Sequence, residues 1–144
     1  MYKFDKRKLT AQNLQDIKNI EKKSFNKEDS LISSLTDEIQ KKNNFIIWCE
    51  VEDKVTGYII FTNVKGTGRI LKIAVHSDYR RRGIGESLVS ECLKRLGSMK
   101  VELHVALSRE DAFRLYLKMG FTVVKKIDAY YGNRPAYLME RCPG

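Results

Sequence analysis

Apolar positions in the middle of the chain change from a continuous run to a helical spacing across a short basic segment. Residues 70–75 form a β-branched apolar run, which is typical of a buried strand. Beyond the basic segment, the apolar positions recur at the spacing of one helix face: Leu88, Val89, Cys92, Leu93 and Leu96. The pattern predicts a strand, a loop and an amphipathic helix, in that order.

The apolar spacing extends this prediction to both ends of the chain. Before residue 70 it indicates a weak edge strand, a helix capped by Thr10, a second helix and two strands of a hairpin: residues 2–9, 10–21, 29–41, 45–51 and 55–61. After residue 97 it indicates a strand, a helix capped at Ser108 and ending at Gly120, a strand, a loop and a last strand: residues 100–105, 108–120, 121–127, 130–135 and 136–140. The order is β-α-α-β-β-β-α-β-α-β-β, an α/β (α+β) arrangement in which helices cover a mixed sheet.

Length and composition favour one intracellular domain. With 144 residues and 42% hydrophobic content, residues 1–144 can bury one core, and they contain no Pro/Gly/Ser-rich linker. Residues 1–7 lack the apolar segment of a signal peptide, and no apolar run of membrane-spanning length occurs, so we expect a soluble, cytoplasmic protein. The three cysteines are widely spaced, which favours neither disulfides nor zinc, and we expect Cys49 and Cys92 in the core.

A basic glycine loop joins the strand at 70–75 to the helix that follows. Arg80, Arg81 and Arg82 precede Gly83 and Gly85, which leave room for a ligand to approach the backbone. A helix start exposes free N–H groups and the positive end of its dipole, so the segment suits phosphate. A basic turn without a ligand is the alternative. The net charge of +9 favours anionic partners in general: coenzyme A, acidic peptides, RNA or a ribosome surface.

The spacing Arg80-x-x-Gly83-x-Gly85 after a strand resembles the acetyl-CoA pyrophosphate loop of the GCN5-related N-acetyltransferase (GNAT) family. The segment from Leu103 to Phe121, with Leu-His-Val and then Leu-Tyr-x-x-x-Gly-Phe, strengthens this likeness. Tyr130 and Tyr131 stand nine and ten residues after Phe121, as in the protein N-terminal branch. That branch contains the bacterial ribosomal-protein alanine acetyltransferase and the eukaryotic and archaeal catalytic subunits.

The resemblance implies a fold, a reaction and a cosubstrate. The fold is a mixed, mostly antiparallel, twisted sheet of about seven strands with about four helices. The reaction is acetyl transfer from acetyl-CoA to an amine, foremost the α-amino group of a protein, without a metal. Contacts with acetyl-CoA are implied at twelve positions: Ile73, Ala74, Val75, Arg80, Arg81, Arg82, Gly83, Ile84, Gly85, Glu86, Arg109 and Tyr116. Arg109 departs from the asparagine that is common there.

Two catalytic roles are implied by the resemblance. Tyr116 matches the tyrosine that protonates the departing thiolate, and packing in the core is its alternative. His104 matches a histidine of several N-terminal acetyltransferases and suits a general base because its ordinary pKa is near neutrality. A strand histidine without a catalytic role is the alternative reading, and the bacterial branch has glutamate there. Other members use a glutamate between the first two helices, where this chain has Lys27 with Glu28 beside it.

The resemblance also implies where the acceptor binds and with what the protein associates. Phe25, Tyr130 and Tyr131 match residues that enclose the first residues of the acceptor, whereas Tyr137 lies in an apolar strand and is expected in the core. We expect a monomer or weak dimer, with the ribosome as an additional partner and no membrane. Two other functions stay open: acetylation of a polyamine, amino acid or antibiotic, and non-catalytic binding of RNA or the ribosome. The chain lacks aromatic RNA-binding motifs and an acidic cluster beside the tyrosine pair.

Overall fold

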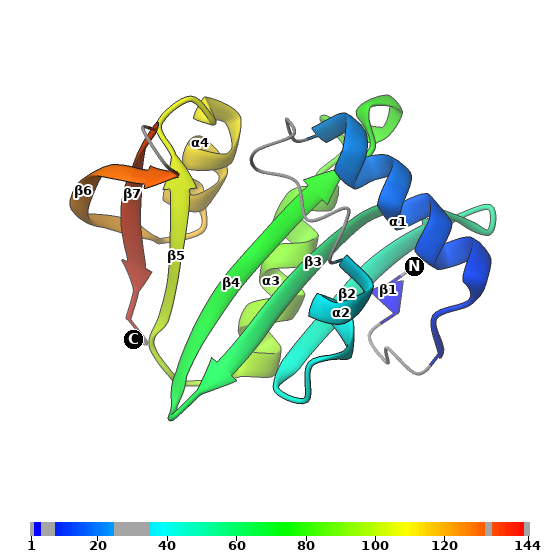
Figure 1. Cartoon of the computed structure of the whole chain (residues 1–144), viewed down its shortest axis with the longest axis horizontal. Coiled ribbons are helices and arrows are strands. Elements are labelled where there is room, and N and C mark those ends of the chain that lie inside the picture. Colours follow the sequence, from blue (N-terminus) through cyan, green and yellow to red (C-terminus); the bar gives the residue numbers. More distant parts are fainter. Residues whose placement is uncertain (1, 4–7, 25–34, 132–133, 143–144) are drawn as a thin grey trace.

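Seven strands form one sheet in the computed structural model, which describes residues 2–3, 8–24, 35–131 and 134–142. The strand order is β1-β2-β3-β4-β5-β7-β6 (Figure 1). The strands are β1 Tyr2–Lys3, β2 Asn44–Val51, β3 Lys54–Val64, β4 Thr67–Val75, β5 Val101–Ala106, β6 Thr122–Tyr131 and β7 Arg134–Arg141. Among these, β4 and β5 pair in parallel, and the other neighbours pair antiparallel. The predicted mixed, mostly antiparallel sheet and the order of the elements are confirmed.

Helices cover both faces of this sheet (Figure 1). One face carries α1 Ala11–Ser24 and α2 Leu35–Gln40, and the other carries α3 Ile84–Leu96 and α4 Glu110–Lys118. A short 3-10 helix, η2 Ser77–Tyr79, joins β4 to the loop before α3. Each face buries its own apolar cluster: Leu88, Val89 and Cys92 of α3 belong to one, and Ile17 and Ile20 of α1 to the other. The apolar spacing of both helices predicted this burial.

Local signals in the sequence fix several boundaries. The hydroxyl of Thr10 accepts from the N–H of Asn13 at 3.0 Å, and the Asn13 side chain accepts from the N–H of Thr10 at 3.2 Å. This reciprocal cap confirms the predicted start of α1. The hairpin between β2 and β3 turns at Glu52 and Asp53, whose φ angles of 51° and 65° give the twist that two-residue turns require.

The sequence misplaced some element ends. The predicted strand at 2–9 is limited to Tyr2–Lys3 within the described residues. The second helix ends at Gln40, one residue earlier than expected, and the predicted part from 29 to 34 lies outside the described residues. The last helix begins at Glu110 with Arg109 as its N-cap, which makes no side-chain cap hydrogen bond, so the predicted Ser108 cap is wrong.

The described residues of the segment 130–135 lie in paired strands and not in the predicted loop. Strand β6 runs on to Tyr131, and β7 begins at Arg134, which pairs with Tyr131. The prediction rested on Gly132, Asn133 and Pro135, which are turn formers. Pairing with β7 extends β6 to Tyr131, and Pro135 lies inside β7, so tertiary pairing outweighs local propensity here.

Half-buried Tyr137 packs against the α3-side cluster, with its ring centroid 5.2 Å from that of Phe113, as expected of a core residue.

None of the helices in the described ranges is long and apolar enough to cross a membrane.

The three cysteines are free thiols in very different environments. Cys49 and Cys92 are buried and Cys142 is exposed, and burial raises the pKa of the Cys92 thiol well above its ordinary value. Because the thiolate is the reactive form, we expect a disulfide reagent at pH 8 to titrate one thiol in the folded protein and all three in denaturant. A Cys142→Ser variant should lose the fast thiol. Rapid reaction of two or more thiols in the folded wild type would contradict this core assignment.

Candidate active site

Strands β4 and β5 pair along only three residues and then separate. Gly68 pairs with Val101, Arg69 with Glu102, and Ile70 with Leu103. Beyond Ile70, β4 continues to Val75 against β3 alone, while β5 continues to Ala106 against β7 alone. Figure 1 shows the two strands close at one end and far apart at the other. Among the described strands, none therefore pairs with the β5-facing edge of β4 along 71–75.

A bulge in β4 marks the point of separation. Lys72 pairs with Ile60 and Ile70 with Phe61, so Leu71 is an extra residue in β4. A bulge bends its strand and increases the local twist. It lies directly after the last pair with β5, so it accounts for the opening of the gap.

The start of α3 lies at the wide end of this gap. Gly83 is the N-cap of α3 in the left-handed conformation, with φ 77°, and no side chain caps this end. The first N–H groups of α3 therefore lack partners within the helix. Arg81 also has a positive φ, 65°, which an L residue adopts at a cost, so the loop is shaped by more than its glycines.

A cleft of about 800 Å³ joins the glycine loop, the end of β4 and the first turn of α4. Ten of the twelve residues predicted to contact acetyl-CoA line it: Ile73, Ala74, Val75, Arg80, Arg81, Gly83, Ile84, Gly85, Glu86 and Arg109. An ideal Cβ at Gly85 would meet Leu115 of α4 at 3.3 Å, so this glycine lets the start of α3 lie close to Leu115. A bound phosphate would find N–H donors and arginines together in this cleft.

Arg82 and Tyr116 do not line the cleft. The guanidinium of Arg82 lies over the ring of Tyr79, 5.0 Å from its centroid. Tyr116 is 5% exposed and packs edge-on against Phe121, with ring centroids 5.7 Å apart. The structure thus places the Tyr116 ring in the α3-side core, and its catalytic role stays a prediction.

The sequence missed the contribution of α4 to the cleft. Five lining residues come from its first turns: Glu110, Asp111, Ala112, Arg114 and Leu115. This end follows β5, which pairs in parallel with β4, so its position beside the carboxyl end of β4 follows from the topology. Arg114 pairs with Glu110 at 3.3 Å, and Lys118 pairs with Glu86 at 2.6 Å across the two helices.

His104 lies on the opposite face of the sheet from the cleft helices. Leu103 and Val105 point into the α3-side cluster, so His104 and Glu102 point toward the α1 side. Its ring stacks on that of Tyr130, with centroids 4.2 Å apart and planes 12° from parallel.

Other predicted site residues lie outside the described residues: Phe25, Lys27, Glu28 and the side chain of Tyr131.

The environment of His104 favours its neutral form. Burial lowers its pKa from the ordinary value, the charge of Arg69 lowers the pKa further, and Glu102 opposes both effects. Glu102 is held by the Arg69 guanidinium, whose Nε donates to it at 3.1 Å. A neutral imidazole at neutral pH can accept a proton.

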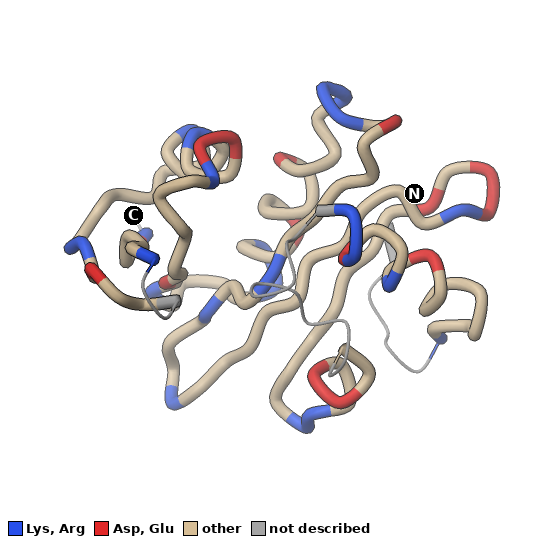
Figure 2. Tube along the Cα trace, turned by 45° about the horizontal axis from the view of Figure 1, so that its top comes forward, with Lys and Arg blue, Asp and Glu red and all other residues tan. Residues whose placement is uncertain are grey.

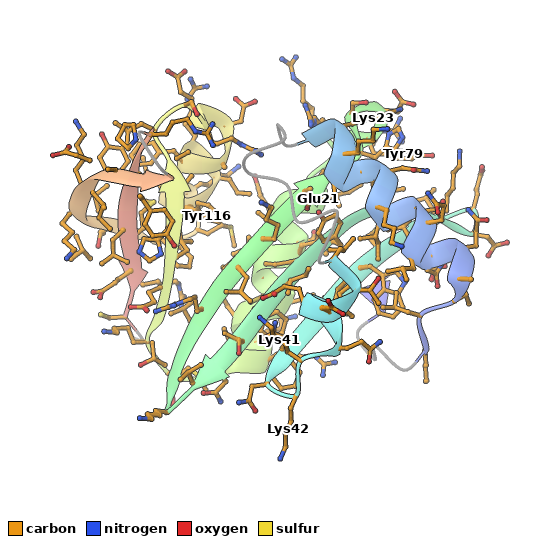
Figure 3. All side chains as sticks on the ribbon, in the orientation of Figure 1. Glu21, Lys23, Lys41, Lys42, Tyr79 and Tyr116 are labelled. Atoms are coloured by element: carbon orange, nitrogen blue, oxygen red, sulfur yellow. The ribbon has the colours of Figure 1, made fainter. Side chains whose placement is uncertain are left out.

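A buried polar group on the α1 side was not predicted at all. Glu21 of α1 and Tyr58 of β3 are both 0% exposed, and the Tyr58 hydroxyl donates to Glu21 at 2.5 Å. The Lys72 Nζ lies 3.9 Å from the other Glu21 oxygen. Burial first, and the charge of Glu21 next, raise the pKa of Tyr58 well above its usual range. In Figure 3, Glu21 lies beneath α1 and Tyr116 lies on the α4 side of the molecule.

No group of three His, Cys, Asp or Glu side chains in the described parts of the chain is placed to hold a metal ion.

Comparison with known proteins agrees with this fold and cleft. Residues 14–121 match the acetyltransferase (GNAT) family. An N-alpha-acetyltransferase of Sulfurisphaera tokodaii is 36% identical over 107 residues, which cover 62% of this chain and 64% of that relative. The chain therefore belongs to the GNAT family of acetyltransferases, and the matched segment spans less than two thirds of this relative.

Solved structures show the same fold at lower identity. The Escherichia coli ribosomal-protein-S18-alanine N-acetyltransferase has a TM-score of 0.80 at 22% identity, covering 98% of this chain and 93% of its own. An aminoglycoside 6'-N-acetyltransferase complexed with coenzyme A has a TM-score of 0.81 at 14% identity, covering 98% and 96%. At such identities the likeness shows a common fold.

The lowered pKa of His104 can be measured by proton NMR, with His76→Asn used to assign the two histidine resonances. We expect His104 to titrate below its ordinary 6.5. Its contribution to stability is then fully present above pH 6.5 and is lost as pH falls through the lower folded value. Tyr130→Ala should move the pKa back toward 6.5, since the stacked ring covers the imidazole. A midpoint at or above 6.5 in the wild type would contradict this environment.

Proposed function

We propose that this protein transfers the acetyl group of acetyl-CoA to the α-amino group of a protein N-terminus. The observation that carries the proposal is the combination of an uncapped glycine helix start with the parting of β4 from β5 beside it. The first provides donors for a pyrophosphate, and the second provides an open strand edge for an extended amide-bearing arm. The family of the chain supports the reaction class.

The residues of the cleft fit acetyl-CoA. The N–H groups of Gly85 and Glu86, with Arg80 and Arg81, would hold the pyrophosphate, and the open edge of β4 would pair with the pantetheine amides. A backbone N–H of β4 near Val75 would stabilise negative charge on the carbonyl oxygen. When bound, acetyl-CoA would supply the activated acetyl group.

Two proton transfers complete the reaction. The acceptor nitrogen must be neutral to attack, and an α-amine has a pKa of about 8 against about 10.4 for lysine, so a mild base suffices for the α-amine. His104 would take that proton, directly or through water, as the N–C bond forms. Tyr116 would give a proton to sulfur as the C–S bond breaks. Tyr130, stacked on His104 and 42% exposed, would contact the acceptor. Phe25 and Tyr131 stay predicted acceptor-binding residues.

The S. tokodaii relative named N-alpha-acetyltransferase favours a protein N-terminus as the acceptor. Small-amine acetylation is the second candidate, because the aminoglycoside enzyme shares the fold. Binding of RNA alone has less support: Figure 2 shows Lys and Arg interspersed with Asp and Glu and spread over many elements, not gathered on one. The ribosome, as the source of new N-termini, is a partner consistent with the net charge of +9.

A thiol-release assay with acetyl-CoA tests the acceptor. The panel contains peptides with free α-amines that differ in their first two residues, a peptide with a blocked N-terminus and free lysine, and spermidine. We expect turnover of free α-amino peptides. Turnover of spermidine or of the blocked peptide alone would overturn the proposed acceptor while keeping the coenzyme.

Gly83→Val should weaken acetyl-CoA binding at least tenfold in isothermal titration, since the left-handed backbone strains any side chain by about 1–2 kcal/mol and the valine would enter the cleft. Gly66→Val is the matched control: Gly66 has φ 82° and the same open surroundings, but lies in the β3–β4 turn. Equal loss in both variants, or loss in neither, would contradict the phosphate-loop assignment.

Tyr116→Phe keeps the ring and removes the hydroxyl. We expect kcat to fall by roughly 10²-fold or more, as for loss of a general acid, with acetyl-CoA affinity nearly retained. Tyr137→Phe is the control. It removes the hydroxyl of a half-buried tyrosine in β7 and should leave kcat unchanged. An unchanged kcat in Tyr116→Phe would contradict the general-acid role and show that this buried tyrosine only packs in the core.

A further inference from the structure

The mechanism above gives no role to the buried group of Glu21, Tyr58 and Lys72. Lys72 comes one residue after the bulge in β4, at the narrow end of the gap. Its side chain is 13% exposed and turns toward α1, as its approach to Glu21 shows. His104 turns toward the same side from β5. An ammonium and an imidazole thus stand on the two strands that border the gap, both on the α1 side.

Glu21 holds the ammonium in this position. One of its oxygens accepts the Tyr58 hydroxyl, and the other faces Lys72 at 3.9 Å. A carboxylate with no exposure requires such partners, because an unpaired buried charge is strongly destabilising. An apolar set of similar volume is often as stable as a buried ion pair, so stability alone does not account for placing one beside the gap.

Among the described residues, positive charge predominates around the α1 side of the gap. Arg69 and Lys125 both act on His104, and the charge of Arg109 acts on Tyr58 from the start of α4. Among the described residues, the carboxylates of Glu102 and Glu21 are both engaged: Glu102 by Arg69, and Glu21 by Tyr58 and Lys72. An acceptor that brings a carboxylate meets a favourable field, and one that brings a second cation meets an unfavourable one.

We propose that Lys72 is a specificity-determining residue that selects acceptor N-termini carrying Asp or Glu in their first two residues. This inference rests on the proposed function and names its substrate class. The ammonium attracts the acceptor carboxylate and disfavours lysine side chains, polyamines and N-termini followed by Lys or Arg. We expect the attraction between the Lys72 ammonium and the acceptor carboxylate to change kcat/KM by roughly tenfold.

The test compares kcat/KM for three free α-amino peptides that are identical except for Glu, Gln or Lys at the second position. In the wild type we expect Glu to exceed Gln by roughly tenfold, and Gln to exceed Lys. Lys72→Met should bring the Glu and Gln values together, and Lys72→Glu should reverse the order. Lys94→Met is the control, because Lys94 is an exposed lysine of α3 on the other face, and it should keep the wild-type ratios.

Lys72→Met leaves Glu21 buried without its cation, so a second variant protects the test against misfolding. Glu21→Gln combined with Lys72→Met removes both charges and leaves an amide oxygen for the Tyr58 hydroxyl. Thermal melting and acetyl-CoA titration establish that each variant is folded and binds the cosubstrate. A wild-type Glu to Gln ratio near one, or an unchanged ratio in the folded double variant, would overturn the inference while N-terminal acetylation stands. Turnover of spermidine in preference to every peptide would overturn both.

Discussion

The limited pairing of β4 with β5 is the feature on which the site depends. Three residue pairs hold the two halves of the sheet together, and the extra residue at Leu71 then bends β4 away. The same separation exposes a strand edge, places the starts of α3 and α4 on either side of one cleft, and leaves His104 and Lys72 on facing strands. A fully paired sheet would satisfy more backbone hydrogen bonds but would leave no route between the two faces.

The two faces of the sheet carry groups of different chemistry. The α3 side combines uncapped N–H groups, arginines and glycines, all of which suit a phosphate-bearing cosubstrate. The α1 side carries two different groups. His104 lies in surroundings that favour its neutral form, and the Lys72 ammonium faces Glu21. Tyr116 is also on the α3 side, buried against Phe121. In the proposed reaction, the anionic cosubstrate would bind from one direction and the peptide from the other.

Much of the fold followed from the sequence because it rests on local rules. The spacing of Leu88, Cys92 and Leu96 predicted the buried face of α3, and the strict alternation of 101–105 predicted which way His104 points. Errors arose where tertiary pairing outweighs local propensity, as at Tyr130, where turn-forming neighbours concealed a strand. The contact between Glu21 and Tyr58 joins residues 37 positions apart, so the local sequence around either residue does not predict it. The family resemblance located the cleft residues, whereas the bulge and the start of α4 required the structure.

Backbone amide NMR during titration with acetyl-CoA tests the central claim most directly, namely that the cosubstrate occupies the gap between β4 and β5. The account predicts that shifts concentrate at 73–75, 81–86 and 109–112, on the parted strand and the two helix starts. Shifts centred instead on the separate cavity of about 590 Å³ beside α1, which Lys22, Lys54 and His76 help to line, would contradict it.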